Sequence, residues 1–171
     1  MNAEELRMMQ KPLKDKYKSE PASALITLKA KGEIAEGISC EVETPSAIVK
    51  AGLHPATGGD GSLICSGDML LEALVACAGV TLNAVSTAIG IVIKSGLVRA
   101  EGDIDFRGTL GVSKEALVGF KSIRLYFNLD TDATDEQLES LEKLTERYCV
   151  VYQTLVKGVQ IETSFLKKNT E

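Results

Sequence analysis

The stretch Cys65–Ile93, CSGDMLLEALVACAGVTLNAVSTAIGIVI, decides how the rest of the chain must fold. Ser66 can cap a helix at its start, and Asp68 in the following turn suits the positive end of a helix dipole. The large apolar residues fall on every side of such a helix: Met69, Leu70, Leu71, Leu74, Val75, Val80, Leu82, Val85 and Ile89. A helix that is apolar all round is typical of a protein core. The sequence therefore predicts a long, buried central helix.

The middle of this helix carries a thiol among small residues. Cys77 is surrounded by Ala73, Ala76, Ala78 and Gly79, which leave room for a second backbone or a ligand. A cysteine in an apolar helix is most often a small hydrophobic residue. Burial also raises the pKa of a thiol unless a cation or a helix terminus lowers it. The residues alone leave Cys77 as either a packing residue or a nucleophile.

A membrane span is the alternative interpretation of the same stretch. Residues 73–93 carry no charge and are about long enough to cross a bilayer. They include four Ser, Thr or Asn residues, however, and Asp68 and Glu72 lie just before them. A single span would also leave the strand-like segments on both sides without a role. We therefore predict a buried helix and no membrane partner.

Composition points to an ordinary globular protein. The 171 residues, with 44% hydrophobic and 25% charged, predict one domain over residues 1–171. A net charge of −5 disfavours nucleic acid as a partner, because phosphate binding requires a basic surface. Residues 1–20 form a predicted helical extension with no apolar signal-peptide core, so we expect a cytoplasmic protein.

The cysteines match neither a disulfide scaffold nor a zinc site. Cys40, Cys65, Cys77 and Cys149 form no CxxC pair, and His54 is the single histidine. Cys40 lies in a strand pattern, whereas Cys65 lies just outside a helix start and is a rival nucleophile to Cys77. The glycine-rich residues 52–62 lack a Walker lysine, so we expect neither a metal nor a cofactor.

The remaining segments alternate between strand and helix patterns, which predicts an α+β fold. Thr134 and Gln137 form a capping box at the start of a second helix, and Cys149 lies at its end. The spacing between Cys77 and Cys149 does not show whether they pair. Strands are expected at residues 25–28, 34–42, 47–51, 97–110, 120–130 and 159–165.

Two motifs resemble those of the OsmC/Ohr superfamily, the osmotically inducible and organic hydroperoxide resistance proteins. SGDMLLEALVACAGVTL at residues 66–82 resembles the first-cysteine helix, and YCVVYQTLVKGVQIE at residues 148–162 resembles the second-cysteine segment. The resemblance covers roughly residues 23–166. It implies antiparallel sheets wrapped around long buried helices in an intertwined homodimer, with active sites at the subunit interface.

The resemblance also implies an activity. Cys77 would be the peroxidatic thiolate of a thiol peroxidase that acts on organic hydroperoxides, and Cys149 the resolving thiol. An external dithiol would then reduce the disulfide. The chain departs from this pattern in two places. Residues 29–32 offer lysines where the family has an arginine, and Val150 replaces the usual proline.

Asp68 is a shorter substitute for the family's glutamate and a candidate catalytic residue, although it could equally serve the helix dipole. These departures leave an alternative function. The protein could be a catalytically quiet relative that binds a small apolar molecule at the dimer interface.

Overall fold

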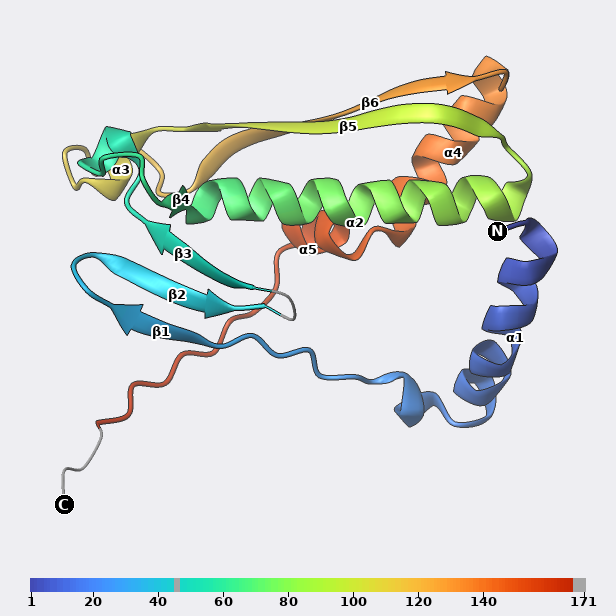
Figure 1. Cartoon of the computed structure of the whole chain (residues 1–171), viewed down its shortest axis with the longest axis horizontal. Coiled ribbons are helices and arrows are strands. Elements are labelled where there is room, and N and C mark those ends of the chain that lie inside the picture. The colour runs from blue at the N-terminus through green and yellow to red at the C-terminus, as the bar shows by residue number, and fades with distance from the viewer. Residues whose placement is uncertain (45–46, 168–171) are drawn as a thin grey trace.

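The computed structural model describes residues 1–44 and 47–167, and its longest helix, α2 (Ser66–Ile89), runs through the middle (Figure 1). A long antiparallel hairpin of β5 (Ile93–Ile104) and β6 (Phe120–Thr131) lies along one side of α2. The other elements are α1 (Ala3–Ser19), β1 (Gly32–Ala35), β2 (Ser39–Glu43), β3 (Ile48–Gly52), β4 (Ile64–Cys65), α3 (Phe106–Thr109), α4 (Asp135–Tyr148) and α5 (Val150–Lys157), with short 3-10 turns at Pro21–Ala24 and Pro55–Thr57. The predicted α+β class is confirmed.

The core lies where the end of α2 meets the hairpin and α4. Leu82, Val85, Ile91 and Leu141 form its buried cluster, and Phe127 of β6 packs against them. Helix α4 begins as predicted, because the Thr134 hydroxyl accepts from the Gln137 N–H while the Gln137 side chain accepts from the Thr134 N–H. One face of α4 thus closes the core over α2.

The N-terminal sheet differs from the prediction. The strand expected over residues 34–42 is a hairpin of β1 and β2, because Gly37 turns the chain with a φ of 70°. Residues 25–28 form no strand, and the short β4, which pairs parallel to β3, had not been predicted. The sheet order is β1-β2-β3-β4.

The start of α2 also differs from the prediction. Cys65 occupies the N-cap position without a side-chain hydrogen bond, and Ser66 is already the first helical residue. Asp68 lies in the first turn, as predicted. The helix is not buried all round, since Leu70 and Ile89 are exposed and Val80 is 71% exposed. Val80 shares a face of α2 with the exposed Ala73 and Ala76, whereas Ile89 lies on the opposite side of the helix.

Helix α2 is also the one helix in the described ranges that is long and apolar enough to cross a membrane. In the fold it contacts α1, β5, α4 and α5, and 28% of its most apolar window is buried. Length and composition alone therefore do not distinguish it from the central helix of a globular fold.

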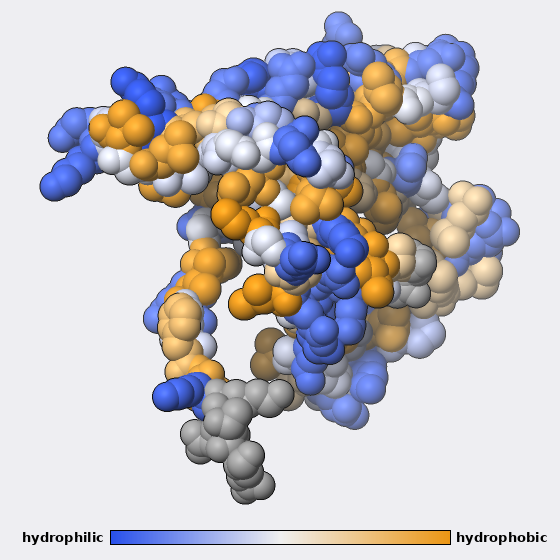
Figure 2. All heavy atoms as spheres, turned by 60° about the vertical axis from the view of Figure 1, so that its left-hand side comes forward, coloured by the Kyte–Doolittle hydropathy of each residue, from blue (hydrophilic) through white to orange (hydrophobic). Residues whose placement is uncertain are grey.

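The end of the chain contradicts the predicted last strand. Residues 158–167 pair with no described strand, and Figure 2 shows them as an arm that leaves the body and carries apolar residues. Val159, Ile161 and Phe165 on this arm are exposed. A strand needs a partner edge for its backbone groups, and no described strand of the chain provides one. The strand expected over 97–110 likewise ends at Ile104, before α3.

Candidate active site

The fold brings the two cysteines of the motifs together. Cys77 lies half-buried near the middle of α2, and Cys149 lies at the junction where α4 ends and α5 begins. Cys149 is 1% exposed, and its thiol lies close to the sulfur of Cys77. Both cysteines are free thiols in this structure. Contact between two cysteines so far apart in the sequence is a product of the tertiary fold.

The start of α5 is directed at the Cys77 sulfur. Burial raises the pKa of Cys77, whereas four groups close to its sulfur lower that pKa: the Val151 N–H, the Cys149 thiol, the Val150 N–H and the Thr81 hydroxyl. These donors outweigh burial and hold the pKa of Cys77 below that of an ordinary thiol. The unpaired N–H groups of a helix start stabilise an anion in the same way. The Cys77 thiol therefore loses its proton more readily than an ordinary cysteine does.

Cys149 has the opposite character. Burial raises the pKa of its thiol, and the hydrogen bond to Cys77 together with the charge of that sulfur raises it further. The N–H groups of Tyr152 and Val151 counter only part of this effect. Two neighbouring groups whose pKa values are driven apart are suited to different steps of one reaction. Here Cys77 suits the thiol that attacks first, and Cys149 suits a thiol that keeps its proton until a later step.

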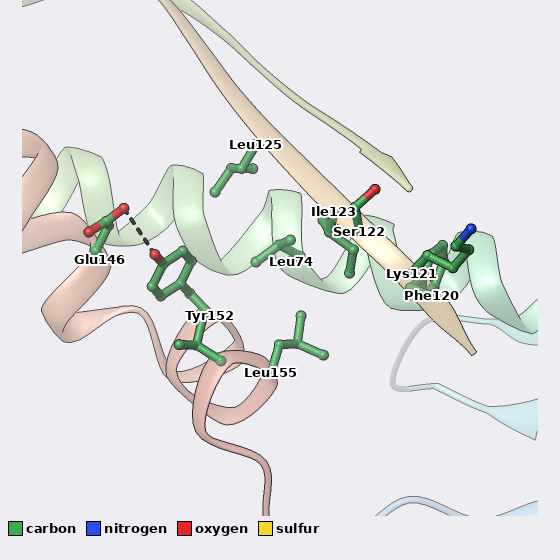
Figure 3. A pocket seen from close by; sticks show the side chains of 10 residues that line it. Leu74, Phe120, Lys121, Ser122, Ile123, Leu125, Glu146, Tyr152 and Leu155 are labelled. Carbon is green, nitrogen blue, oxygen red and sulfur yellow. Dashed lines mark hydrogen bonds between the residues drawn. The ribbon is translucent and has the colours of Figure 1, made fainter. Parts of the chain in front are cut away.

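A pocket of about 460 Å³ lies between α2, β6 and α5, and neither Cys77 nor Cys149 is among the residues that line it (Figure 3). Its walls are mostly apolar side chains, among them Leu74, Phe120, Ile123, Leu125, Leu155 and Val156. At one end the Tyr152 hydroxyl donates to Glu146 Oε1 at 3.0 Å. Burial, and then this hydrogen bond and the charge of Glu146, raise the pKa of Tyr152. Lys121 and Ser122 line the opposite side, so the pocket combines an apolar wall with polar groups and suits a small organic molecule.

Asp68 and Cys65 lie elsewhere. They line a separate pocket of about 340 Å³ with His54, whose ring stacks on Phe106 at 4.9 Å between centroids. Asp68 is nine residues before Cys77, about 14 Å along the helix axis. The chain by itself therefore does not bring Asp68 to the Cys77–Cys149 pair, and Cys65 forms no part of that pair.

Sequence reasoning missed the groups that surround the thiols. Thr81, Val151, Tyr152 and Glu146 had not been singled out, and Val150 had been noted only as a replacement for proline. A helix starting directly after Cys149 would have pointed to the two N–H donors. In the described part of the chain, no group of three or more His, Cys, Asp or Glu side chains is placed to hold a metal ion.

The comparisons with known proteins now identify the family. A family model described as OsmC-like protein matches residues 59–164, which include both cysteines of the pair. The chain belongs to the OsmC-like protein family. A search of curated proteins finds no match.

Solved structures of the OsmC-like family share the fold. An OsmC-like protein from Mycoplasma pneumoniae matches with a TM-score of 0.65 at 18% identity, covering 78% of this chain and 89% of that chain. An organic hydroperoxide resistance protein from Elizabethkingia anophelis, solved with thiocyanate bound, matches with a TM-score of 0.61 at 18% identity, covering 78% and 90%.

A third structure, titled as an organic hydroperoxide resistance protein OsmC from Legionella pneumophila, matches with a TM-score of 0.59 at 19% identity, covering 78% of this chain and 91% of that chain. The OsmC-like fold expected from the two motifs is confirmed by these matches.

Proposed function

We propose that this OsmC-like protein is a thiol peroxidase that reduces organic hydroperoxides with Cys77 and Cys149. The observation that carries the proposal is the position of the Cys77 sulfur, which lies close to two N–H groups at the start of α5 and to the thiol of Cys149. This arrangement supports a stabilised thiolate without the arginine that the family pattern supplies. Residues 29–32 offer lysines instead.

The chemistry follows from the two thiols. The Cys77 thiolate attacks the outer oxygen of the hydroperoxide, the O–O bond breaks, and an alkoxide leaves and takes up a proton. Cys77 becomes a sulfenic acid. The Cys149 sulfur then attacks the sulfur of Cys77, and the sulfenic oxygen leaves as water when it gains a proton. An external dithiol reduces the disulfide by thiol exchange and returns both thiols.

The pocket of Figure 3 favours an organic substrate. Its leucine, isoleucine, valine and phenylalanine side chains offer a surface for an alkyl or aryl group, which hydrogen peroxide lacks. Because reduced thiols persist in the cytoplasm, we propose that compartment for the protein.

We also propose that the protein is a homodimer. The exposed face of α2 and the apolar arm after Gly158 are surfaces that a second copy would bury. For Asp68, its distance from Cys77 within the chain favours the helix-dipole role over a catalytic one.

One experiment tests the function. One equivalent of cumene hydroperoxide is added to the reduced protein, and the oxidation state of each cysteine is followed by peptide mass spectrometry. We expect rapid formation of a Cys77–Cys149 disulfide, its loss in Cys77→Ser, and no change in Cys65→Ser. Thiols that stay reduced over minutes would refute the peroxidase. The apolar pocket would then favour the ligand-binding alternative.

A further inference from the structure

A second, smaller cavity is lined by Cys149 but not by Cys77. Its volume is about 70 Å³. Ala78, Leu125 and Phe127 form its apolar wall. Besides Cys149, the other residues that line it are polar: Glu142, Thr145, Glu146 and Tyr152. The peroxidase chemistry above assigns no role to these polar residues.

Thr145 is the first indication that the cavity holds something polar. The residue is 3% exposed, and its hydroxyl finds no hydrogen-bond partner among the described residues. A buried hydroxyl without a partner is costly, and native structures commonly satisfy such groups with ordered water. The cavity has room for about two water molecules, and four polar side chains surround it.

Glu146 is the second indication. It lies one helical turn before Cys149 and lines the same cavity. Its carboxylate accepts a hydrogen bond from the Tyr152 hydroxyl at 3.0 Å, and its backbone carbonyl accepts one from Gln153 Nε2 at 2.8 Å. Glu146 and Tyr152 also line the outer pocket. The carboxylate is thus held in place between the buried thiol and a space open to solvent.

We propose that the cavity holds water between Thr145, Cys149 and Glu146, and that Glu146 accepts the proton of Cys149 when the disulfide forms. This role rests on the proposed peroxidase function. It makes Glu146 the base of the resolving step, in which Cys149 attacks Cys77. The Cys149 S–H bond breaks, and its proton passes through the water to the carboxylate. The S–S bond forms as the S–O bond of the Cys77 sulfenic acid breaks, and the released hydroxide becomes water by taking a proton back.

The charges around Cys149 are consistent with this path. Helix α4 contributes Glu142 and Glu146, α5 contributes Tyr152, and α2 contributes Cys77. Strand β6 contributes only apolar side chains to the cavity among the described residues, and its Lys121 lines the outer pocket. Carboxylates are therefore the bases available to the buried thiol.

The test separates disulfide formation from peroxide chemistry. A Cys40→Ser, Cys65→Ser background is treated with the aromatic disulfide DTNB, and release of the coloured thiol is followed in time. The first release reports attack by Cys77. The second reports attack by Cys149 on the mixed disulfide, a step that requires no peroxide. Glu146→Gln keeps the acceptor for Tyr152 but removes the base, and the exposed Glu139→Gln on α4 is the matched control.

We expect Glu146→Gln to slow the second release at least about tenfold near neutral pH. The difference in the rate of the second release between Glu146→Gln and the unmodified background should shrink as the pH rises, because bulk hydroxide then removes the Cys149 proton. Thr145→Val should slow the same step, while Glu139→Gln should leave both steps unchanged. Parallel pH profiles for Glu146→Gln and the unmodified background would overturn the proposal.

Oxidation by cumene hydroperoxide distinguishes a failure of the proposed peroxidase function from a failure of the proton-acceptor role of Glu146. If cumene hydroperoxide leaves Cys77 reduced, the peroxidase function fails whatever DTNB shows. If Cys77 is oxidised and Glu146→Gln closes the disulfide at the normal rate, only the proton-acceptor role fails.

Discussion

Two regions of this molecule have similar apolar residues but very different packing. In the closed region, the end of α2, the β5–β6 hairpin and α4 enclose a core in which Leu141 is 1% exposed. In the open region, Ile34 of β1, Val80 of α2 and Ile161 of the C-terminal arm remain exposed. Hydrophobic residues alone therefore do not make a core, because each apolar face also needs a second face to cover it.

The active-site thiols lie between these regions. Helix α4, from the closed region, leads directly into Cys149, whereas Ala73, Ala76 and Val80 of α2 face outward close to Cys77. A single chain thus builds the thiol pair and leaves one side of it open. We propose that the second subunit covers this side.

The largest effect is expected in the closed region. Leu141→Ala removes a fully buried side chain and should lower the free energy of unfolding by about 3 kcal/mol. Leu117→Ala, at an exposed position in the loop after α3, should change it by less than about 0.5 kcal/mol. Urea denaturation followed by circular dichroism measures both. Equal losses would mean that the closed region is not the main core.

The open region is tested by assembly rather than by core stability. Ile161→Asp places a charge on the C-terminal arm, and a subunit interface there would have to bury it. We expect the dissociation constant of the dimer to rise by at least about tenfold. Sedimentation velocity measures it, with Leu117→Asp as a control of similar exposure. An unmodified protein that sediments as a monomer would contradict the proposed dimer.

A smaller effect on stability is expected at the starts of α4 and α2. Thr134→Ala removes the capping box of α4 and should cost about 1 kcal/mol of stability. Ser66→Ala should cost less than about 0.5 kcal/mol, because Ser66 is already inside α2 and does not cap it. Thermal unfolding of the two variants compares them. A larger loss for Ser66→Ala would show that the hydroxyl caps the helix after all.

The smallest effect is a shift in the reactivity of Cys77. Val150→Pro removes one N–H donor to the sulfur, and proline is tolerated because Val150 is the first residue of α5. The thiolate loses a stabilising N–H group, so the pKa of Cys77 should rise. Alkylation by iodoacetamide, which requires the thiolate, should then move to higher pH. Val150→Ala keeps the N–H and should not move the profile, and identical profiles for both variants would exclude the donor.

The sequence predicted which helices and cysteines form the site, but it did not predict the contacts that set the pKa values of the thiols. The apolar stretch around Cys77 predicted α2, and the Thr134–Gln137 box predicted α4. The family motifs pointed to Cys77 and Cys149 as partners. The hydrogen bonds that set their pKa values could not be predicted, because they depend on where α5 begins relative to α2.

Sequence by itself determined the α+β class, the long central helix and the two cysteines, since these follow from local periodicity, capping and motif spacing. Only the tertiary structure decided that α5 aims its N–H groups at Cys77, that Asp68 lies apart from it, and that residues 159–165 form no strand in the single chain. Each of these depends on which surfaces meet. A strand pattern records a preference for pairing, but a partner edge must be present before the strand can form.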